Sequence, residues 1–465
     1  MFFERVSPIT GRVASRAAAM TAAEACAVAE RAAAGFKAWA EMGPNARRAL
    51  LGQAAEALEQ RRDQFVQAMT DELGATAGWA LFNLMLAASM TREAAALTTR
   101  VGGEVIPSDK PGCVALSVRE PVGVVLGIAP WNAPIILGVR AIATPLACGN
   151  AVILKASELC PRTHELIIEA FAAAGFPEGV VNLVTNDPKD AGAVVGALID
   201  HPAVRRVNFT GSTAVGRVIA RRCADKLKPC LLELGGKAPF VVLEDANLDE
   251  AVKAAAFGAF MNQGQICMST ERIIPVAAIA DEFTRRFAEK ARSMASGDPR
   301  EGKTPLGAVV DRRTVEHVNG LIDDAVGAGA RVLAGGKAEG VIMPATVVDA
   351  VTPKMRLYRE ESFGPIVAII RAADEAEAVR VANDSEYGLS ASVFTGDAAR
   401  GLRVARQIHS GMCHINGPTV HDEAQMPFGG VGASGYGRFG GAAGIDQFTE
   451  LRWITIETAP GHFPI

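Results

Sequence analysis

Short apolar runs that alternate with helical segments constrain the fold of this chain more than any other feature. They span residues 122–129, 151–154, 180–184 and 204–209. A strand is continuously apolar, as the first two runs are, where helices cover both faces of its sheet. Helical stretches at 161–174 and 190–199 separate the runs. This alternation predicts a parallel, doubly wound α/β sheet.

The rest of the chain predicts further layers around this sheet. With 465 residues the chain is too long for one hydrophobic core, so we expect two or three domains. Residues 21–100 have apolar positions at helical spacing and predict two or three amphipathic helices. The alternating run 114–119 favours an exposed or edge strand, and the tail 447–456 alternates in the same way. A second α/β region is predicted from strands near 239–243, 366–370 and 392–394 and helices near 251–260 and 281–294.

Composition excludes several classes of partner. Hydrophobic residues make up 49% and charged residues 21% of the chain, and the formal net charge is -4. This balance gives no electrostatic reason to expect nucleic acid or an anionic membrane. We find no run of about 18 apolar residues that could span a membrane, and residues 1–8 do not resemble a secretion signal. The eight cysteines are scattered, which indicates a reducing, cytoplasmic compartment.

One cysteine stands in a setting that suits a nucleophile. Cys267 follows a helical stretch, in a break that contains Gly264 and Gln265. A nucleophilic cysteine needs an accessible thiol whose thiolate form is stabilised. A lone cysteine is more often a small buried hydrophobe, so both interpretations stay open for this residue alone.

Two further residues suit roles in acyl chemistry. Glu233 follows the apolar pair Leu231-Leu232, and partly apolar surroundings raise the pKa of a carboxyl group towards that of a general base. Asn132 follows the run 122–129, where its side-chain amide can donate to a developing oxyanion.

Glycines and charged residues after two strands suit a nucleotide. Gly211 and Gly216 bracket a turn that opens a probable helix, whose N–H groups fit a pyrophosphate. Lys155 and Glu158 follow the run 151–154 and can bind ribose hydroxyls. An ordinary glycine turn and a solvated loop are equally good interpretations of these residues taken singly.

Taken together, the motifs resemble the NAD(P)-dependent aldehyde dehydrogenase superfamily, and the resemblance runs from about residue 3 to residue 456. The matching pieces, in chain order, are Pro130-Trp131-Asn132, Lys155 with Glu158, Phe209-Thr210-Gly211-Ser212 with Gly216, Glu233-Leu234-Gly235-Gly236-Lys237, Gly264-Gln265-Ile266-Cys267, Glu360-Glu361-Ser362-Phe363-Gly364-Pro365 and Pro427-Phe428-Gly429-Gly430.

The resemblance implies roles for these positions. Cys267 is expected to be the nucleophile, Glu233 the base for deacylation, and Asn132 with the Cys267 N–H the oxyanion hole. Lys237 lies near the base in this pattern and is expected to support it. The residues expected to bind the cofactor are Trp131, Lys155, Ser157, Glu158, Gly211, Ser212, Gly216, Leu234, Gly235, Glu361 and Phe363. The presence of Glu233 favours hydrolysis over acyl transfer to coenzyme A, and the complete set argues against a purely structural or binding role.

The resemblance also implies an architecture and partners. Residues 1–100 and 121–233 are expected to form a Rossmann-like cofactor-binding domain, 234–446 a catalytic domain, and 101–120 with 447–458 a small β oligomerisation element. We expect a homodimer or a dimer of dimers without a metal. Glu158 favours NAD because a carboxylate repels the 2′-phosphate of NADP, although NADP stays possible.

The substrate is predicted from residues 412–430, which resemble the branch that acts on benzaldehydes such as salicylaldehyde and vanillin. A broad aliphatic or semialdehyde dehydrogenase is the alternative. Arg140 lies eight residues beyond Asn132, slightly more than two helical turns, and can reach a ring oxygen on the substrate. Trp79 and Phe428 are expected to pack against the ring. The alternative for Arg140 is an ion pair with a carboxylate at the tunnel rim, with Trp79 filling the core.

Overall fold

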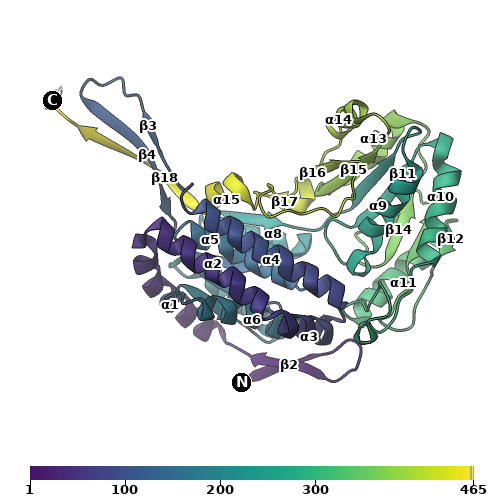
Figure 1. The fold of residues 1–465 in the computed structure, drawn as a ribbon, viewed down its shortest axis with the longest axis horizontal. Helices are drawn as coiled ribbons and strands as arrows, with labels where there is room; N and C mark the ends of the chain where they lie inside the picture. The colour runs from purple at the N-terminus through teal and green to yellow at the C-terminus, as the bar shows by residue number, and fades with distance from the viewer. Residues whose placement is uncertain (461–462, 464) are drawn as a thin grey trace.

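The computed structural model describes residues 1–460, 463 and 465. Two lobes lie side by side, and a long β arm extends from the first lobe beside the C-terminus (Figure 1). The predicted α/β fold class is confirmed, since each lobe is built on its own largely parallel sheet.

The first lobe contains a six-stranded sheet in the order β17-β9-β8-β5-β6-β7. Its strands are β5 (Val124–Ile128), β6 (Ala151–Lys155), β7 (Val181–Val184), β8 (Val204–Thr210), β9 (Cys230–Glu233) and β17 (Gly435–Tyr436). Five strands are parallel, and β17 pairs antiparallel with β9. β5 and β6 are buried along their whole length, as their apolar sequence predicts.

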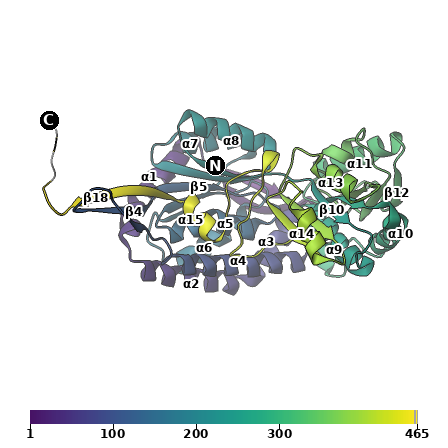
Figure 2. The same cartoon turned by 90° about the horizontal axis from the view of Figure 1, so that it is seen from above.

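Helices cover both faces of this sheet (Figure 2). They are α1 (Ala22–Glu41), α2 (Pro44–Gln60), α3 (Arg62–Leu73), α4 (Ala77–Leu97), α5 (Pro134–Ala147), α6 (Pro161–Ala173), α7 (Ala191–Asp200) and α8 (Thr213–Asp225). Val125 and Val152 pack into the core beneath α2–α6, whereas Val124 and Ile153 pack against α1, α7 and α8. Alternate residues of one strand therefore serve two cores.

The prediction of two or three helices in residues 21–100 was too low, because the structure forms four. The breaks are very short. Pro44 begins α2, Arg61 alone separates α2 from α3, and Gly74 ends α3 in the left-handed region at φ +69°. Breaks of this length do not interrupt the helical spacing of apolar residues, so the periodicity merges neighbouring helices.

The second lobe contains a seven-stranded sheet in the order β12-β13-β14-β11-β10-β15-β16, parallel except for β12. Its strands are β10 (Ala238–Val242), β11 (Thr270–Pro275), β12 (Arg331–Ala334), β13 (Thr346–Asp349), β14 (Ile366–Ile369), β15 (Ser390–Phe394) and β16 (Met412–Ile415). Its helices are α9 (Leu248–Phe260), α10 (Ala277–Arg292), α11 (Arg312–Gly327), α12 (Arg356–Arg359), α13 (Glu375–Asn383) and α14 (Ala398–Ala405).

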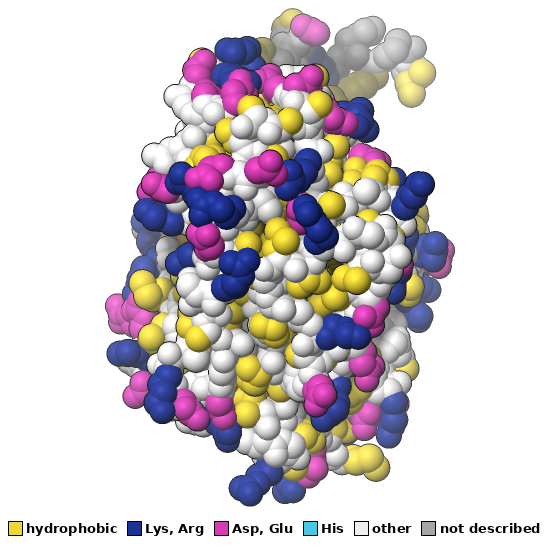
Figure 3. All heavy atoms as spheres, turned by 90° about the vertical axis from the view of Figure 1, so that its right-hand side faces the viewer, with side chains coloured by type: hydrophobic (Ala, Val, Ile, Leu, Met, Phe, Trp, Pro, Cys, Tyr) yellow, Lys and Arg dark blue, Asp and Glu magenta, His cyan; other side chains and the backbone are white. Residues whose placement is uncertain are grey.

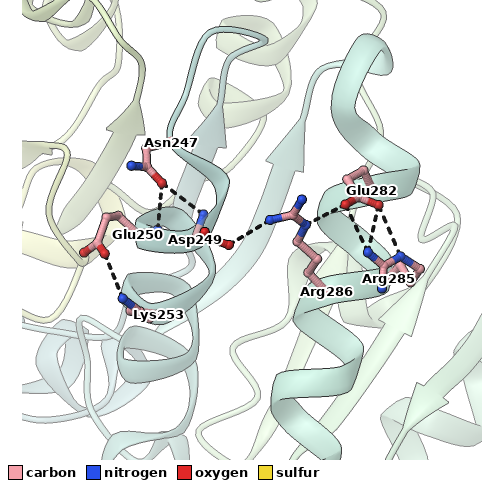
Figure 4. Close-up of polar contacts among 7 residues, drawn as sticks. All are labelled: Asn247, Asp249, Glu250, Lys253, Glu282, Arg285 and Arg286. Atoms are coloured by element: carbon pink, nitrogen blue, oxygen red, sulfur yellow. Dashed lines mark hydrogen bonds and ion pairs between the residues drawn. The ribbon is translucent and has the colours of Figure 1, made fainter.

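Helix α9 leads to the segment that contains Cys267, and polar contacts anchor its first turn (Figure 4). The Asn247 side chain accepts hydrogen bonds from the N–H groups of Asp249 and Glu250. Asp249 also pairs with Arg286 on α10 at 2.7 Å, and Arg286 pairs with Glu282 at 2.6 Å. Exposed pairs of this kind contribute at most about 1 kcal/mol each, so they mainly fix the orientation of α9.

The arm is a three-stranded antiparallel sheet in the order β18-β4-β3. Its strands are β3 (Glu104–Ile106), β4 (Cys113–Pro121) and β18 (Thr449–Glu457). Residues 114–119 were predicted to form an exposed or edge strand. The edge alternative was wrong, because β4 is the central strand, whereas the exposed alternative fits, since Ala115 is the only one of these residues that is buried. The partner strand β18 comes from the far end of the sequence. Apolar and polar residues can alternate along this central strand because no further layer of the described residues covers the sheet.

Shorter elements complete the fold. They are the N-terminal hairpin β1 (Phe2–Val6) and β2 (Val13–Ala18), the 3₁₀ turns η1 (Pro188–Asp190), η2 (Met261–Gly264), η3 (Pro299–Glu301) and η4 (Gly432–Ser434), and α15 (Gly441–Gln447). The domain boundaries expected from the sequence stay a prediction. β17 does not follow these boundaries, because it lies within residues 234–446 and yet pairs with β9 in the six-stranded sheet.

The surface of the second lobe carries both signs of charge. On the face shown in Figure 3, Lys and Arg side chains alternate with Asp and Glu, and small apolar areas lie between them. Among the described residues, no helix is long and apolar enough to cross a membrane.

Candidate active site

Cys267 lies in a tightly held loop between α9 and β11. Asn262 and Gln263 adopt the left-handed conformation, with φ of 49° and 56°. The Gln263 side-chain amide donates to the Ala308 carbonyl at 2.8 Å, and the Gln265 side-chain oxygen Oε1 accepts from the Val310 N–H at 2.9 Å. These bonds hold a strained turn, as is common at functional sites.

Asn132 lies beside this loop, just before α5. Its backbone carbonyl accepts hydrogen bonds from Trp79 Nε1 and from Asn262 Nδ2, both at 3.0 Å. Its side chain lines two cavities that meet at Cys267. Asn262 was not predicted from the sequence, and no local signal marks a contact between residues 130 positions apart.

Glu233 ends β9 and is 1% exposed. Among the described residues, neither of its carboxylate oxygens has a hydrogen-bond partner. Burial raises the pKa of Glu233 to about 7, although the nearby Cys267 thiol and the Arg140 charge oppose the rise.

The Cys267 thiol and Glu233 influence each other. Burial and the neighbouring Glu233 carboxylate raise the pKa of the Cys267 thiol well above its usual value. No hydrogen bond of normal geometry joins the two side chains, so the pair is close but not locked together. The neighbouring Glu233 carboxylate therefore disfavours the thiolate form of Cys267.

Two glycines allow the strands to pass close to this pair. A Cβ on Gly236 would lie 2.2 Å from the Cys267 carbonyl oxygen, and one on Gly235 would lie 2.6 Å from Glu361 Oε2. Both distances are far inside van der Waals contact. The Cys267 carbonyl belongs to the backbone and cannot easily move, so residue 236 requires glycine, whereas a side chain at residue 235 would displace the Glu361 carboxylate.

Glu361 faces the site from the opposite side. It accepts a hydrogen bond from the Gly236 N–H at 2.8 Å, and burial raises its pKa to about 8. Glu271 holds the next residue by accepting from the Ser362 N–H at 2.9 Å. The expectation that Lys237 supports Glu233 was wrong, because its ammonium group is buried against Glu271 at 2.6 Å.

Two adjoining cavities lie along the carboxyl ends of β5, β6 and β8. One, of about 280 Å³, is lined by Trp131, Asn132, Gly211, Ser212, Gly235, Cys267, Glu361 and Phe363. The Trp131 and Phe363 rings meet edge to face there, 5.6 Å apart. The other cavity, of about 530 Å³, is lined by residues that include Trp131, Lys155, Ser157, Glu158 and Gly211.

Two residues expected to bind the cofactor lie behind these walls. Gly216 and Leu234 are buried against each other, and a Cβ on Gly216 would lie 2.5 Å from a Leu234 methyl group. Lys155 and Glu158 lie in the larger cavity as expected, but they form an ion pair with each other.

A third cavity, of about 250 Å³, opens on the other side of Cys267 and is largely apolar. Its walls include Trp79, Phe82, Asn132, Ile136, Leu137, Arg140, Phe257, Met268, Val420, Asp422 and Phe428. Arg140 lies over the Phe428 ring, with Cζ 4.1 Å from the centroid, and pairs with Asp422 at 2.5 Å. The ion pair that was the alternative for Arg140 is therefore present. Trp79 both packs in the core and lines the cavity.

A thiol placed between a cleft at the carboxyl ends of a parallel sheet and an apolar cavity is the arrangement expected of an oxidoreductase that would hold its substrate on a cysteine beside a dinucleotide. The model of the aldehyde dehydrogenase family matches residues 1–454, and the chain belongs to this family. The resemblance inferred from the motifs is thereby confirmed.

Characterised relatives cover nearly the whole chain. A vanillin dehydrogenase from Pseudomonas sp. is 56% identical, over 100% of this chain and 96% of the relative. A salicylaldehyde dehydrogenase from Pseudomonas sp. is 49% identical, over 99% and 96%. The crystal structure of a salicylaldehyde dehydrogenase from Pseudomonas putida with salicylaldehyde has a TM-score of 0.98 and 48% identity, over 100% of this chain and 96% of that one.

Proposed function

We propose that this aldehyde dehydrogenase oxidises benzaldehydes, ring-hydroxylated ones in particular, to the corresponding benzoates. The observation that carries the proposal is the apolar cavity of about 250 Å³ that ends at Cys267. Trp79 and Phe428 give it aromatic walls suited to a planar ring. The vanillin and salicylaldehyde dehydrogenases named above support the same substrate class.

The first step joins the substrate to the enzyme. Glu233 takes the proton of the Cys267 thiol, and the sulfur adds to the aldehyde carbon. The carbonyl π electrons move to the oxygen, and the Asn132 side chain and the Cys267 N–H stabilise the alkoxide by donating hydrogen bonds. The product is a hemithioacetal on Cys267.

The remaining steps form and release the acid. The hemithioacetal re-forms its carbonyl as it loses a hydride, for which a bound oxidised nicotinamide would be the acceptor. A thioester remains on Cys267. The proton that Glu233 took from the thiol passes to solvent, and the ionised carboxylate then takes a proton from a water molecule, whose oxygen attacks the thioester carbon. The tetrahedral intermediate collapses by expelling the Cys267 sulfur, which takes the proton back from Glu233, and the carboxylic acid leaves.

The two cavities behind Cys267 fit an NAD(P) cofactor. They form a continuous path past the first turn of α8, whose free N–H groups suit a pyrophosphate. Lys155 and Glu158 would hold the adenine-side ribose, and Glu361 the nicotinamide ribose.

We further propose that NAD is preferred, because the Glu158 carboxylate would repel a 2′-phosphate. In a Glu158→Gln variant the ratio of kcat/KM for NADP to that for NAD should rise at least about fivefold. An unchanged ratio would remove Glu158 from cofactor selection.

A screen of aldehydes tests the proposed substrate class. NADH formation should be most efficient with benzaldehyde and its hydroxylated derivatives, and weaker with aliphatic aldehydes of similar size. The rival class is represented by a succinate-semialdehyde dehydrogenase from Burkholderia pseudomallei, 33% identical with a TM-score of 0.95. Recognising the carboxylate of a semialdehyde needs an unpaired cation, whereas Arg140 is already neutralised by Asp422. Higher efficiency with succinate semialdehyde would overturn the proposal.

We also propose that the chain works in the cytoplasm as a homodimer or dimer of dimers assembled through the β arm. All eight cysteines are free thiols, which suits a reducing compartment. The outer strand β18 exposes Leu451 and Trp453, the latter 78% exposed, along an edge without a paired strand among the described residues. Such an edge suits pairing with a second copy.

A further inference from the structure

The Arg140–Asp422 pair is unusual because one oxygen of the Asp422 carboxylate lacks a hydrogen-bond partner within the part of the chain that the structure describes. The Asp422 side chain is 7% exposed, and its Oδ2 accepts from Arg140 Nη2 at 2.5 Å. Its other oxygen, Oδ1, is buried and has no hydrogen-bond partner among the described residues. An unsatisfied buried carboxylate oxygen is costly, and proteins keep few of them without a function.

The place of this oxygen points to the substrate. Asp422 and Arg140 both line the cavity that ends at Cys267. Arg140 is six residues beyond Pro134 along α5, or about 9 Å along the helix axis. The pair therefore lies well away from Asn132. The far end of a benzaldehyde bound at Cys267 would lie beside the pair.

We propose that Asp422 Oδ1 accepts a hydrogen bond from a neutral hydroxyl at the para position of the substrate ring. Arg140 acts as a positioning residue, because it holds Oδ2 and is itself held over the Phe428 ring. This differs from the sequence-based hypothesis, in which the Arg140 guanidinium itself binds a phenol or phenolate. The inference rests on the proposed function, since it assumes that the cavity takes a benzaldehyde ring.

The two hypotheses predict opposite effects of ionising the phenol. A carboxylate accepts from a phenol but repels a phenolate, whereas a guanidinium attracts the phenolate. The charged and titratable groups that act on Asp422 are Arg140 on α5, His421 on its own loop and Glu233 at the end of β9. Burial raises the pKa of Asp422, whereas Arg140, His421 and the Glu423 N–H oppose the rise.

Binding of ketones that cannot be oxidised tests the proposal without turnover. Dissociation constants of 4-hydroxyacetophenone, 4-methoxyacetophenone and acetophenone are measured by calorimetry, below and above the pKa of the phenol. Below it, the hydroxyl compound should bind about tenfold more tightly than the other two, as expected for a hydrogen bond to a charged group. Above it, this advantage should disappear. An advantage that grows when the phenol ionises, or none at either pH, would overturn the proposal in favour of Arg140 or of a water molecule on Oδ1.

An Asp422→Asn variant tests the residue itself. The amide oxygen would keep the hydrogen bond from Arg140. The NH2 group would then take the place of Oδ1, and this group donates hydrogen bonds instead of accepting them. The preference for the hydroxyl compound should fall to within about twofold, with acetophenone binding unchanged. Glu423→Gln is the matched control, because it removes one charge from the same loop at a side chain that is 44% exposed, and it should keep the preference.

The outcomes separate this inference from the proposed function. If the wild-type enzyme oxidises benzaldehydes but shows no hydroxyl preference, only the role of Asp422 fails. If it does not oxidise benzaldehydes, the proposed function fails, whatever the ketones do. Should Asp422→Asn fold poorly, the pH and methoxy comparisons in the wild-type enzyme still decide the question.

Discussion

Cys267 and Glu233 are the two residues on which the proposed chemistry depends, and each can be tested by a small change. Replacing Cys267 by Ser keeps the size of the side chain but removes its thiolate, because a hydroxyl group has no comparable ionised fraction near neutral pH. Dehydrogenase turnover should fall at least about 1,000-fold while the melting temperature and NAD binding stay unchanged. Near-normal turnover in NADH assays would exclude Cys267 as the nucleophile.

Glu233→Gln should separate the two halves of the reaction. The amide cannot take a proton from water, so one equivalent of NADH should form in a burst and the acyl-enzyme should accumulate. Rapid-mixing absorbance measures the burst, and intact-protein mass spectrometry detects the trapped acyl group. Steady turnover without a trapped acyl group would contradict the assigned role.

The raised pKa of Glu233 predicts a pH profile. Water activation requires the ionised carboxylate, and burial places this pKa at about 7. The kcat for the hydrolytic step should therefore rise as the pH increases through about 7 and fall below it. A profile that is flat between pH 6 and 8 under conditions where deacylation limits the rate would show that a different group is titrating.

At the same scale, sequence motifs single out residues that the structure places together, but they do not predict the partners of those residues. Cys267, Glu233 and Asn132 lie in short segments whose local pattern is informative, and the structure brings them together. Asp422 lies 282 positions from its partner Arg140, so no local pattern predicts that pair. The pairing of Lys237 with Glu271 was missed for the same reason.

At the scale of elements, the turn at Gly235-Gly236 packs closely against the loop that contains Cys267. In Gly236→Ala the added methyl group would push against the Cys267 carbonyl, which a Cβ would approach to 2.2 Å. A shift of about 1 Å at a reacting atom lowers kcat roughly 100-fold.

A matched variant controls for the effect of alanine on stability. Gly52 lies within α2 with nothing near its Cβ position, so Gly52→Ala should raise stability by about 1 kcal/mol without changing kcat. Equal kcat values in the two variants would show that the loop accommodates a side chain at residue 236.

Element types were predictable because apolar runs and helical spacing depend on burial, which the sequence records directly. Strands β5 and β6 follow this rule. What the sequence does not record is the partner of each strand. β4 was expected to be an exposed or edge strand because of its alternation. Its central place could not be predicted, since its pairing with β18 depends on residues more than 300 positions away.

At the scale of the whole molecule, the arm predicts assembly. Trp453→Glu places a charge on an exposed apolar strand and should shift the protein towards smaller species in light scattering after gel filtration. Leu227→Glu is the control, because Leu227 is 92% exposed on the first lobe and belongs to none of the three strands of the arm. An unchanged mass for the Trp453 variant would remove β18 from the interface.

The strand β17 has a consequence for how the chain is made. It comes from residues 435–436, and yet it covers the edge of β9, the strand that ends in the catalytic carboxylate. A ribosome releases the other five strands of that sheet about 200 residues earlier. Until the last segment emerges, the nascent first lobe presents an open edge beside Glu233, and it can acquire its finished base only after nearly the whole second lobe has been synthesised.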